Sequence, residues 1–197
     1  MFLLGDIMQK YEIEKLIKKV EKVNDYELLY FVKKLIRERN YLNELVNKDT
    51  LTGLNNRRVL GDIKDCSAVV MCDIDDYKQV NDLYGHSIGD SVIKSIGNIL
   101  KLNVRESDCV CRYGGDEFLI VFIDCPEHII YKRIETIRKI AESSLLLSNG
   151  EKITMSFGIA INSGNDLEDL INKADIALYQ SKESGKNRIK KYESYDK

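Results

Sequence analysis

The sequence predicts an α/β domain in which helices flank a central sheet, preceded by a separate helical segment. Two observations lead to this fold class. Short apolar runs of strand length alternate with longer stretches of helical periodicity from about residue 67 onward, and residues 9–47 are rich in Glu, Lys, Leu and Ile with neither Gly nor Pro. At 197 residues the chain has room for one domain of about 150 residues and a short appendage.

The N-terminal segment is expected to form two helical pieces that meet near residues 24–25. In the second piece Leu28, Leu35 and Leu42 recur every seven residues, with Phe31 at a complementary position and Glu38 interrupting one turn. This stripe fits either an intersubunit coiled coil or a helix that packs on its own domain, and three heptads do not separate the two. We therefore divide the chain into a helical dimerisation or signalling segment, residues 1–48, and a catalytic-sized domain, residues 49–197.

Within the second unit, turn residues at 49–58 precede an apolar strand that ends in acids. The expected strands are 67–75, 108–112, 117–123 and 153–161, and the expected helices are 91–102, 127–144 and 167–182. Pro126 lies where a strand should give way to a helix.

Composition excludes several classes of protein. The net charge of −2 gives no global basic field, so no nucleic acid polymer is expected as a partner. The five cysteines show no CxxC spacing and only two histidines accompany them, which argues against a disulfide framework or structural zinc. Neither a signal peptide nor a run of about 18 apolar residues is present, so we expect a cytoplasmic protein without membrane insertion.

Acidic residues stand where two expected strands meet loops. Asp73 ends the first apolar strand, and Asp116 and Glu117 follow Gly114-Gly115, which we expect to form a tight hairpin turn with positive φ. Single acids at such positions are usually solvated, but acids at the mouth of a buried strand are costly without a cation. Magnesium uses one or two carboxylates and leaves positions for phosphate oxygens, so a two-ion phosphoryl-transfer site is predicted.

Six sequence blocks, in order, carry a family resemblance. They are DTLTGLNNRR (49–58), DIDDYKQVND (73–82), YGHSIGD (84–90), RYGGDEF (112–118), SFGI (156–159) and ADIALY (174–179) continuing to Lys186-Asn187. Together they resemble the GGDEF-domain diguanylate cyclases over residues 49–190. The resemblance implies a palm-like nucleotide cyclase fold with a mixed, partly antiparallel sheet. It also implies a homodimeric enzyme that condenses two GTP molecules into cyclic di-GMP and two pyrophosphates.

The resemblance also implies roles for particular residues. Magnesium, two ions per site with manganese as a possible substitute, would be held by Asp73, the Ile74 carbonyl and Asp116. Asp116 would also be the base for the 3′-hydroxyl, with Glu117 beside it and Lys78 stabilising phosphate charge. The residues expected to bind GTP are Asn81 and Asp90 at guanine, His86 along the site, and Lys182 and Lys186 at the triphosphate.

Arg105 and Asp108 match the family's RxxD site, which implies feedback inhibition by bound cyclic di-GMP. Only fourteen positions separate Arg58 from Asp73, so the helix expected there must be very short or absent. The alternative function is a non-catalytic receptor of GTP or cyclic di-GMP that signals through its N-terminal helix. An enzyme that uses ATP or makes another dinucleotide is disfavoured by Asp90, since adenine lacks guanine's pair of donors.

Overall fold

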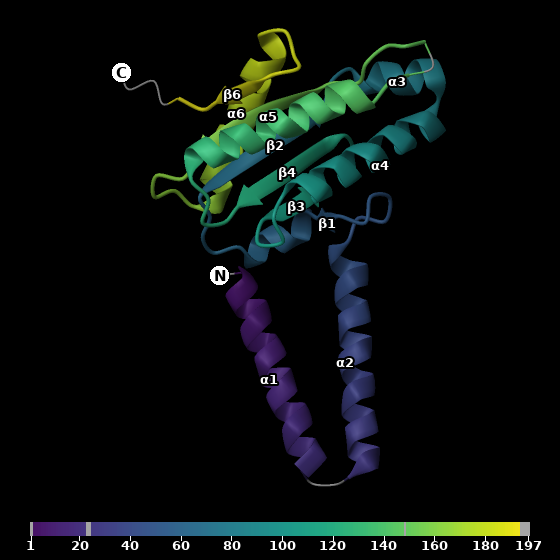
Figure 1. The fold of residues 1–197 in the computed structure, drawn as a ribbon, viewed down its shortest axis with the longest axis vertical. Coiled ribbons are helices and arrows are strands. Elements are labelled where there is room, and N and C mark those ends of the chain that lie inside the picture. Colours follow the sequence, from purple (N-terminus) through teal and green to yellow (C-terminus); the bar gives the residue numbers. More distant parts are fainter. Residues whose placement is uncertain (1, 23–24, 148, 194–197) are drawn as a thin grey trace.

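The computed structural model describes residues 2–22, 25–147 and 149–193. A helical hairpin projects from an α/β domain (Figure 1). The helices are α1 (Phe2–Lys22), α2 (Tyr26–Asn47), the 3-10 helix η1 (Arg57–Asp62), α3 (Tyr77–Tyr84), α4 (His86–Asn103), α5 (Glu127–Ser144) and α6 (Leu167–Glu183). The strands are β1 (Asn55–Asn56), β2 (Ala68–Ile74), β3 (Cys109–Arg112), β4 (Glu117–Phe122), β5 (Met155–Ile161) and β6 (Ile189–Lys191).

The six strands form one mixed sheet in the order β1-β3-β4-β2-β5-β6. The four inner strands pair antiparallel, whereas β1 and β6 add in parallel at the two edges. Strand β2 lies between β4 and β5 and is buried along its whole length. The expected mixed sheet flanked by helices, with helices preceding it, is confirmed.

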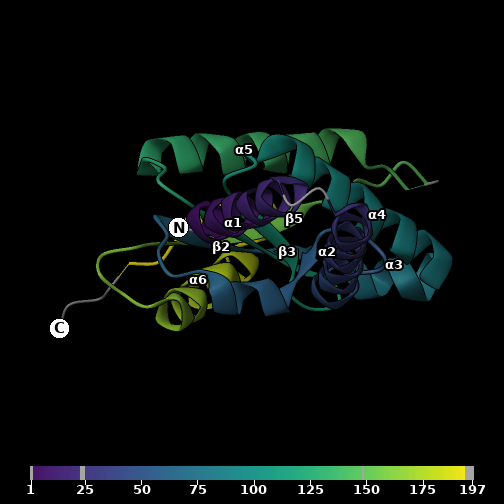
Figure 2. The same ribbon diagram turned by 90° about the horizontal axis from the view of Figure 1, so that it is seen from below.

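Side chains of β2 alternate between two cores, as a pleated strand requires. Val70, Cys72 and Ile74 face the core formed with α4 and α5. Val69 and Met71 face the core formed with α6 and η1. Figure 2 shows these layers, with α5 on one side of the sheet and α6 on the other. The odd-numbered face, towards α6, is therefore the one on which Asp73 lies.

Helix α6 packs unusually close to β5 because of Gly158. A Cβ at this position would lie 2.1 Å from the Ala174 carbonyl oxygen and 2.1 Å from the Leu178 nitrogen, both backbone atoms. Only glycine fits such a distance, since backbone cannot move aside as a flexible side chain can. This contact fixes the height of α6, and hence of its C-terminal lysine, above the sheet.

The N-terminal hairpin is largely exposed. Asp25 caps α2 by accepting a hydrogen bond from the Leu28 nitrogen at 2.9 Å. Helix α1 packs along α2, where Leu29, Val32 and Ile36 are half-buried at helical spacing. The seven-residue stripe lies on a different face and is open: Leu28, Leu35 and Leu42 are 43%, 51% and 57% exposed. The alternative in which the stripe packs on its own domain is therefore wrong for this chain as folded.

Other details can be compared with expectation one by one. Helix α3 was not anticipated, and α4 begins at His86 rather than Ser91. Between Arg58 and Asp73 the structure has only the 3-10 helix η1, so the helix there is indeed very short. All five cysteines are unpaired and buried, and burial raises the pKa of Cys66 and Cys109 to about 11. No helix in the described ranges has the length and apolar composition needed to cross a bilayer.

Candidate active site

Three carboxylates gather at the end of β2. In the antiparallel register Asp73 lies opposite Glu117 of β4, and directly opposed residues share a face of the sheet. The Ile74 nitrogen donates to the Asp116 carbonyl oxygen at 3.4 Å, which brings the turn before β4 against the end of β2. Asp73, Glu117 and Asp116 form what we call the acid edge. All three residues therefore lie at the same end of the paired strands β2 and β4.

Asp73 is the buried member of the acid edge, with 7% of its side chain exposed. Burial raises its pKa to about 6, the nearby charges of Asp116 and Glu117 act in the same direction, and Lys182 opposes the shift. The Lys182 Nζ lies 2.8 Å from Asp73 Oδ2. Negative charge is thus concentrated at the acid edge, and among the described residues Lys182 forms an ion pair with Asp73.

The acid edge fits a magnesium ion. Among the described residues, no group of three or more His, Cys, Asp and Glu side chains is arranged so that it could hold a metal ion by itself. Magnesium does not need one, since it commonly takes one or two carboxylates and completes its shell with water and phosphate oxygens. A buried carboxylate with a raised pKa beside two further acids is stabilised by a cation, and the donors are all hard oxygens.

The Gly114-Gly115 turn differs in one respect from expectation, because neither glycine has positive φ. The value of Gly114 is its small size: a Cβ there would lie 2.5 Å from Glu117 Oε2, so the Glu117 side chain folds across it. Arg112 holds the turn by donating to the Gly115 carbonyl oxygen from Nε at 2.9 Å and from NH2 at 2.6 Å.

Arg112 also ties the turn to the chain just after α2. Its NH1 donates to both carboxylate oxygens of Asp49, at 3.3 and 3.2 Å, and Asp49 also accepts from the Thr52 nitrogen and hydroxyl. Burial acts to raise the pKa of Asp49, but Thr52 and Arg112 outweigh it and lower the pKa. The sequence pattern did not predict this contact, because Arg112 and Asp49 are 63 positions apart and meet only in the folded chain.

The residues expected at guanine lie on adjacent helices, Asn81 on α3 and Asp90 on α4. Gly89 permits this approach: a Cβ there would lie 2.0 Å from Asn81 Oδ1 and 2.8 Å from the Tyr77 hydroxyl. Asn81 Oδ1 is buried and has no hydrogen-bond partner among the described residues. Burial raises the pKa of Tyr77, and the charges of Asp90 and Asp116 add to this effect.

His86 and Lys78 occupy the first turns of the same two helices, on the exposed side. His86 begins α4 and Lys78 is the second residue of α3, which follows Asp76 directly. Because α3 follows the end of β2, Lys78 lies only five positions after Asp73 and belongs to the same end of the sheet. Lys78 thus lies near the acid edge in the chain, whereas His86 lies at the start of the next helix.

Lys182 and Lys186 contact different acids, one in β2 and one in the loop that follows it. Lys182, in the last turn of α6, contacts Asp73, whereas the Lys186 Nζ lies 2.6 Å from Asp76 Oδ1. The hydrogen bond to Asp76 raises the pKa of Lys186. Asp75, between the two acids, is buried and accepts from the hydroxyls of Thr154 and Ser156 at 2.7 and 2.6 Å. Asp75 therefore serves the structure of the loop.

The RxxD pair lies away from the acid edge, before β3. Arg105 is exposed, but the Asp108 side chain has no exposed surface. Its carboxylate accepts from the Arg105 nitrogen at 3.1 Å, from the Ile123 nitrogen at 3.2 Å and from Arg133 NH1 at 3.4 Å. Asp108 thus acts here as an anchor rather than an open acceptor. Arg133 on α5, which sequence reasoning missed, joins Arg105 as the second cation of this cluster.

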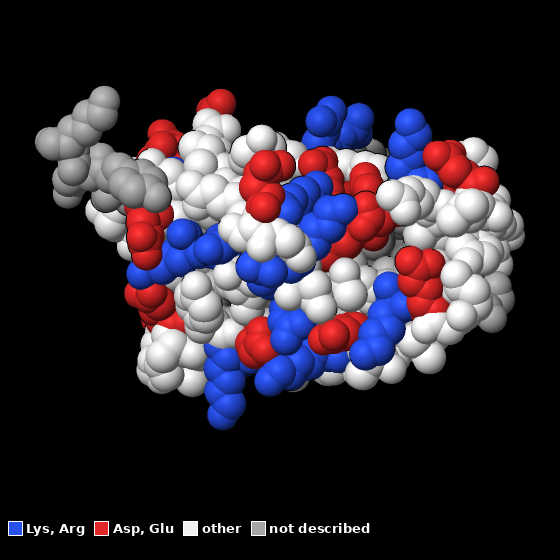
Figure 3. Space-filling model, turned by 90° about the horizontal axis from the view of Figure 1, so that it is seen from above, with Lys and Arg blue, Asp and Glu red and all other residues white. Residues whose placement is uncertain are grey.

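Charge on the surface near the end of α6 is mixed in sign. Figure 3 views the domain from above, and Lys and Arg side chains alternate there with Asp and Glu. A surface of this kind has no broad cationic stripe for a nucleic acid polymer. It does contain local sites in which a lysine and an acid are neighbours.

Comparison with known proteins identifies a common family. Residues 46–188 match the model of the GGDEF domain, described as diguanylate cyclase. The chain is 38% identical over 159 residues to diguanylate cyclase DosC of Escherichia coli K12, covering 73% of this chain and 35% of that protein. It is 37% identical over 133 residues to diguanylate cyclase A of Treponema denticola, covering 66% and 36%. The chain thus spans about a third of the length of these curated relatives.

Two solved structures are similar to most of the chain. The coiled coil and GGDEF domain of DgcB from Caulobacter crescentus, in complex with c-di-GMP, superposes with a TM-score of 0.73 at 27% identity, covering 84% of this chain and 95% of that one. Diguanylate cyclase SiaD from Pseudomonas aeruginosa, in complex with its activator SiaC, gives a TM-score of 0.73 at 27% identity, covering 95% and 77%.

Proposed function

Since the chain belongs to the GGDEF family of diguanylate cyclases, we propose that it joins two GTP molecules into cyclic di-GMP and releases two pyrophosphates. The acid edge carries this proposal: Asp73 is buried beside Asp116 and Glu117 at the end of β2, with Lys182 2.8 Å away. A degenerate receptor has no need to keep buried acids that disfavour folding. We place the reaction in the cytoplasm.

Asp73, Asp116 and the Ile74 carbonyl are the proposed magnesium ligands, two ions per site. Bound magnesium neutralises phosphate charge and makes a bound hydroxyl more acidic. Asp116 accepts the proton of the attacking 3′-hydroxyl, and Glu117 adds negative charge beside it. The 3′-oxygen forms a bond to the α-phosphorus of the second GTP as the bond to pyrophosphate breaks, and a second such step closes the ring.

The remaining residues bind and orient GTP. Asp90 accepts from the guanine N1–H and 2-amino group, and Asn81 pairs with the base from the facing helix. Lys182 and Lys186 exchange their contacts with Asp73 and Asp76 for triphosphate oxygens, with Lys78 adding charge from α3 and His86 lining the site. Asp90 makes ATP the poorer substrate, because adenine presents no matching pair of donors.

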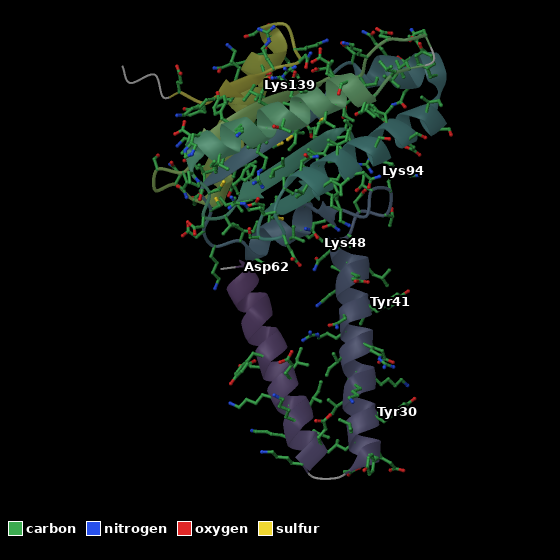
Figure 4. All side chains as sticks on the ribbon, in the orientation of Figure 1. Tyr30, Tyr41, Lys48, Asp62, Lys94 and Lys139 are labelled. Carbon is green, nitrogen blue, oxygen red and sulfur yellow. The ribbon has the colours of Figure 1, made fainter. Side chains whose placement is uncertain are left out.

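One acid edge is half of the catalyst, because each GTP attacks the other. We propose a homodimer formed through the exposed stripe of α2, since α1 occupies a different face and leaves Leu28, Leu35 and Leu42 uncovered. Tyr30 and Tyr41 do not belong to this stripe and lie on the side of α2 that points away from α1 (Figure 4). A similar structure contains a coiled coil joined to its GGDEF domain. Residues 1–48 are thus proposed as the dimerisation segment and 49–197 as the catalytic domain.

Product feedback is proposed at the cluster of Arg105, Arg133 and Asp108. Two arginines beside one buried acid leave an excess positive charge that suits the phosphates of cyclic di-GMP. The DgcB structure, which is similar over 84% of this chain, contains c-di-GMP. Asp108 accepts from the backbone nitrogen of Arg105 and from the side chain of Arg133, so its loss should affect both.

The proposed activity is tested by incubating the full chain with GTP and magnesium and identifying products by chromatography and mass. Asp116→Asn should abolish cyclic di-GMP. Asp124→Asn is the matched control: the same chemical change at an exposed position just after β4, with a left-handed φ of 45° that asparagine tolerates. GTP binding without product in the native chain would instead favour a receptor.

A further inference from the structure

The loop between α6 and β6 has a strained backbone. Lys186 and Asn187 are consecutive and both left-handed, with φ of 59° and 46°. Residues other than glycine enter this region at a cost in free energy, asparagine less than most. Two in succession persist only where neighbouring groups hold them. From this loop the Lys186 side chain reaches Asp76, three positions after Asp73 of the acid edge.

Asn187 is held from two sides. Its backbone nitrogen donates to Asp75 Oδ2 at 3.0 Å, and its side-chain Oδ1 accepts from Arg138 NH1 of α5 at 2.8 Å. Asp75 is buried and fixed in turn by Thr154 and Ser156. Asn187 therefore links Asp75, just after β2, to helix α5, which lies on the opposite side of the sheet from α6.

Arg138 is itself restrained. It is 14% exposed, donates to Glu135 at 2.8 Å through both Nε and NH2, and reaches Glu142 at 3.1 Å. These acids raise the pKa of Arg138 and fix its planar group, so it presents NH1 to Asn187 in one orientation. The charge of Arg138 is balanced by the two glutamates, which makes it an orienting donor rather than a phosphate ligand.

We propose that Arg138 and Asn187 are positioning residues for GTP binding, which act by fixing the backbone from which Lys186 reaches the phosphates. This inference rests on the proposed function, because it assigns a purpose to Lys186 at the same site. Lys186 lies next to Asn187 in the chain, and its Nζ is held at Asp76, one residue beyond the Asp75 that anchors Asn187. Arg138 acts on the nucleotide only through this loop.

A double-mutant cycle in nucleotide binding tests the proposal. The probe is the non-hydrolysable analogue α,β-methylene-GTP with magnesium, and calorimetry on the full chain gives its Kd. We expect Arg138→Met and Asn187→Gly each to weaken binding by about three- to tenfold when Lys186 is present. In a Lys186→Met background each should weaken binding by less than about twofold. Asn187→Gly deletes the side chain but keeps the left-handed backbone accessible, and it carries the cycle alone if Arg138→Met fails to fold.

Two further variants separate positioning from general stability. Lys139→Met removes a neighbouring cation of α5 that is 67% exposed and pairs with the same Glu135, and it should leave Kd unchanged. Arg138→Lys keeps one donor and should recover part of the affinity. If Arg138→Met and Asn187→Gly each weaken binding as much in the Lys186→Met background as when Lys186 is present, the positioning role is wrong. The cyclase proposal would remain intact. A native chain that neither binds the analogue nor forms product would overturn both.

Discussion

Replacing Asp73 by asparagine should stabilise the metal-free protein while it removes a proposed magnesium ligand. The reason is that the folded state holds the pKa of Asp73 at about 6, above the ordinary aspartate value of 3.8, chiefly through burial. A raised acid pKa means that the folded state binds the proton more tightly than the unfolded state does. Stability is therefore lost as pH rises from 3.8 through about 6, and the full cost is present at pH 7.5.

The size of the effect follows from the same two values. The difference between about 6 and 3.8, at about 1.4 kcal/mol per factor of ten, gives about 3 kcal/mol at pH 7.5. Asparagine avoids this cost, which already includes the opposing effect of Lys182, so we expect a net gain of about 1–3 kcal/mol, or a rise in Tm of about 2–12 °C. At pH 4 the gain should largely disappear, because Asp73 is then protonated in the folded protein.

Urea unfolding at pH 7.5 and pH 4, with EDTA present, measures both values. Asp62→Asn is the control, since Asp62 is exposed at the end of η1 and should change stability by less than about 0.5 kcal/mol (Figure 4). An Asp73→Asn variant that is less stable than the native chain at pH 7.5, or that gains the same stability at both pH values, would contradict a destabilising charge on Asp73.

Three further predictions concern the nucleotide, the dimer and the product. Asp90→Ser should lower kcat/KM for GTP by about tenfold or more while ATP turnover changes little, because guanine loses a charged acceptor; an unchanged preference would remove Asp90 from base recognition. Leu35→Asp should raise the dimer Kd by at least about tenfold in light scattering, whereas Tyr30→Asp, on the outer side of α2, should not; equal effects would contradict dimerisation through the stripe. Arg105→Ala should raise the cyclic di-GMP concentration needed for half-inhibition about tenfold with an unchanged initial rate, and retained inhibition would exclude the cluster.

Strong local patterns predicted most of the domain. Strand β2 was recognisable because it is apolar up to Asp73, and α5 and α6 because their buried positions recur at helical spacing. Helix α3 was missed because it is short, buries only Val80 and begins after a left-handed Asp76. The edge strands β1 and β6 have two and three residues with mostly polar side chains, so their pairing depends on the sheet beside them.

The acid edge could be anticipated because its members follow strands or turns that the sequence marks. Arg133 could not, since it lies on α5 and meets Asp108 only through tertiary packing. The same holds for Arg138, which reaches Asn187 across 49 positions of sequence. Positive φ at Gly114 and Gly115 was a wrong prediction, because a glycine pair also serves where a side chain must fold closely over the backbone.

Diguanylate cyclase activity is tested most directly by supplying the full chain and magnesium with an equal mixture of unlabelled GTP and GTP uniformly labelled with ¹⁵N. We expect a cyclic product without terminal phosphates, in three mass classes in the ratio 1:2:1, because each molecule combines two guanosine units. Two pyrophosphates should appear per product. A product in two equal mass classes, which contains a single guanosine unit, or a linear dinucleotide that never closes, would contradict the assignment as a diguanylate cyclase.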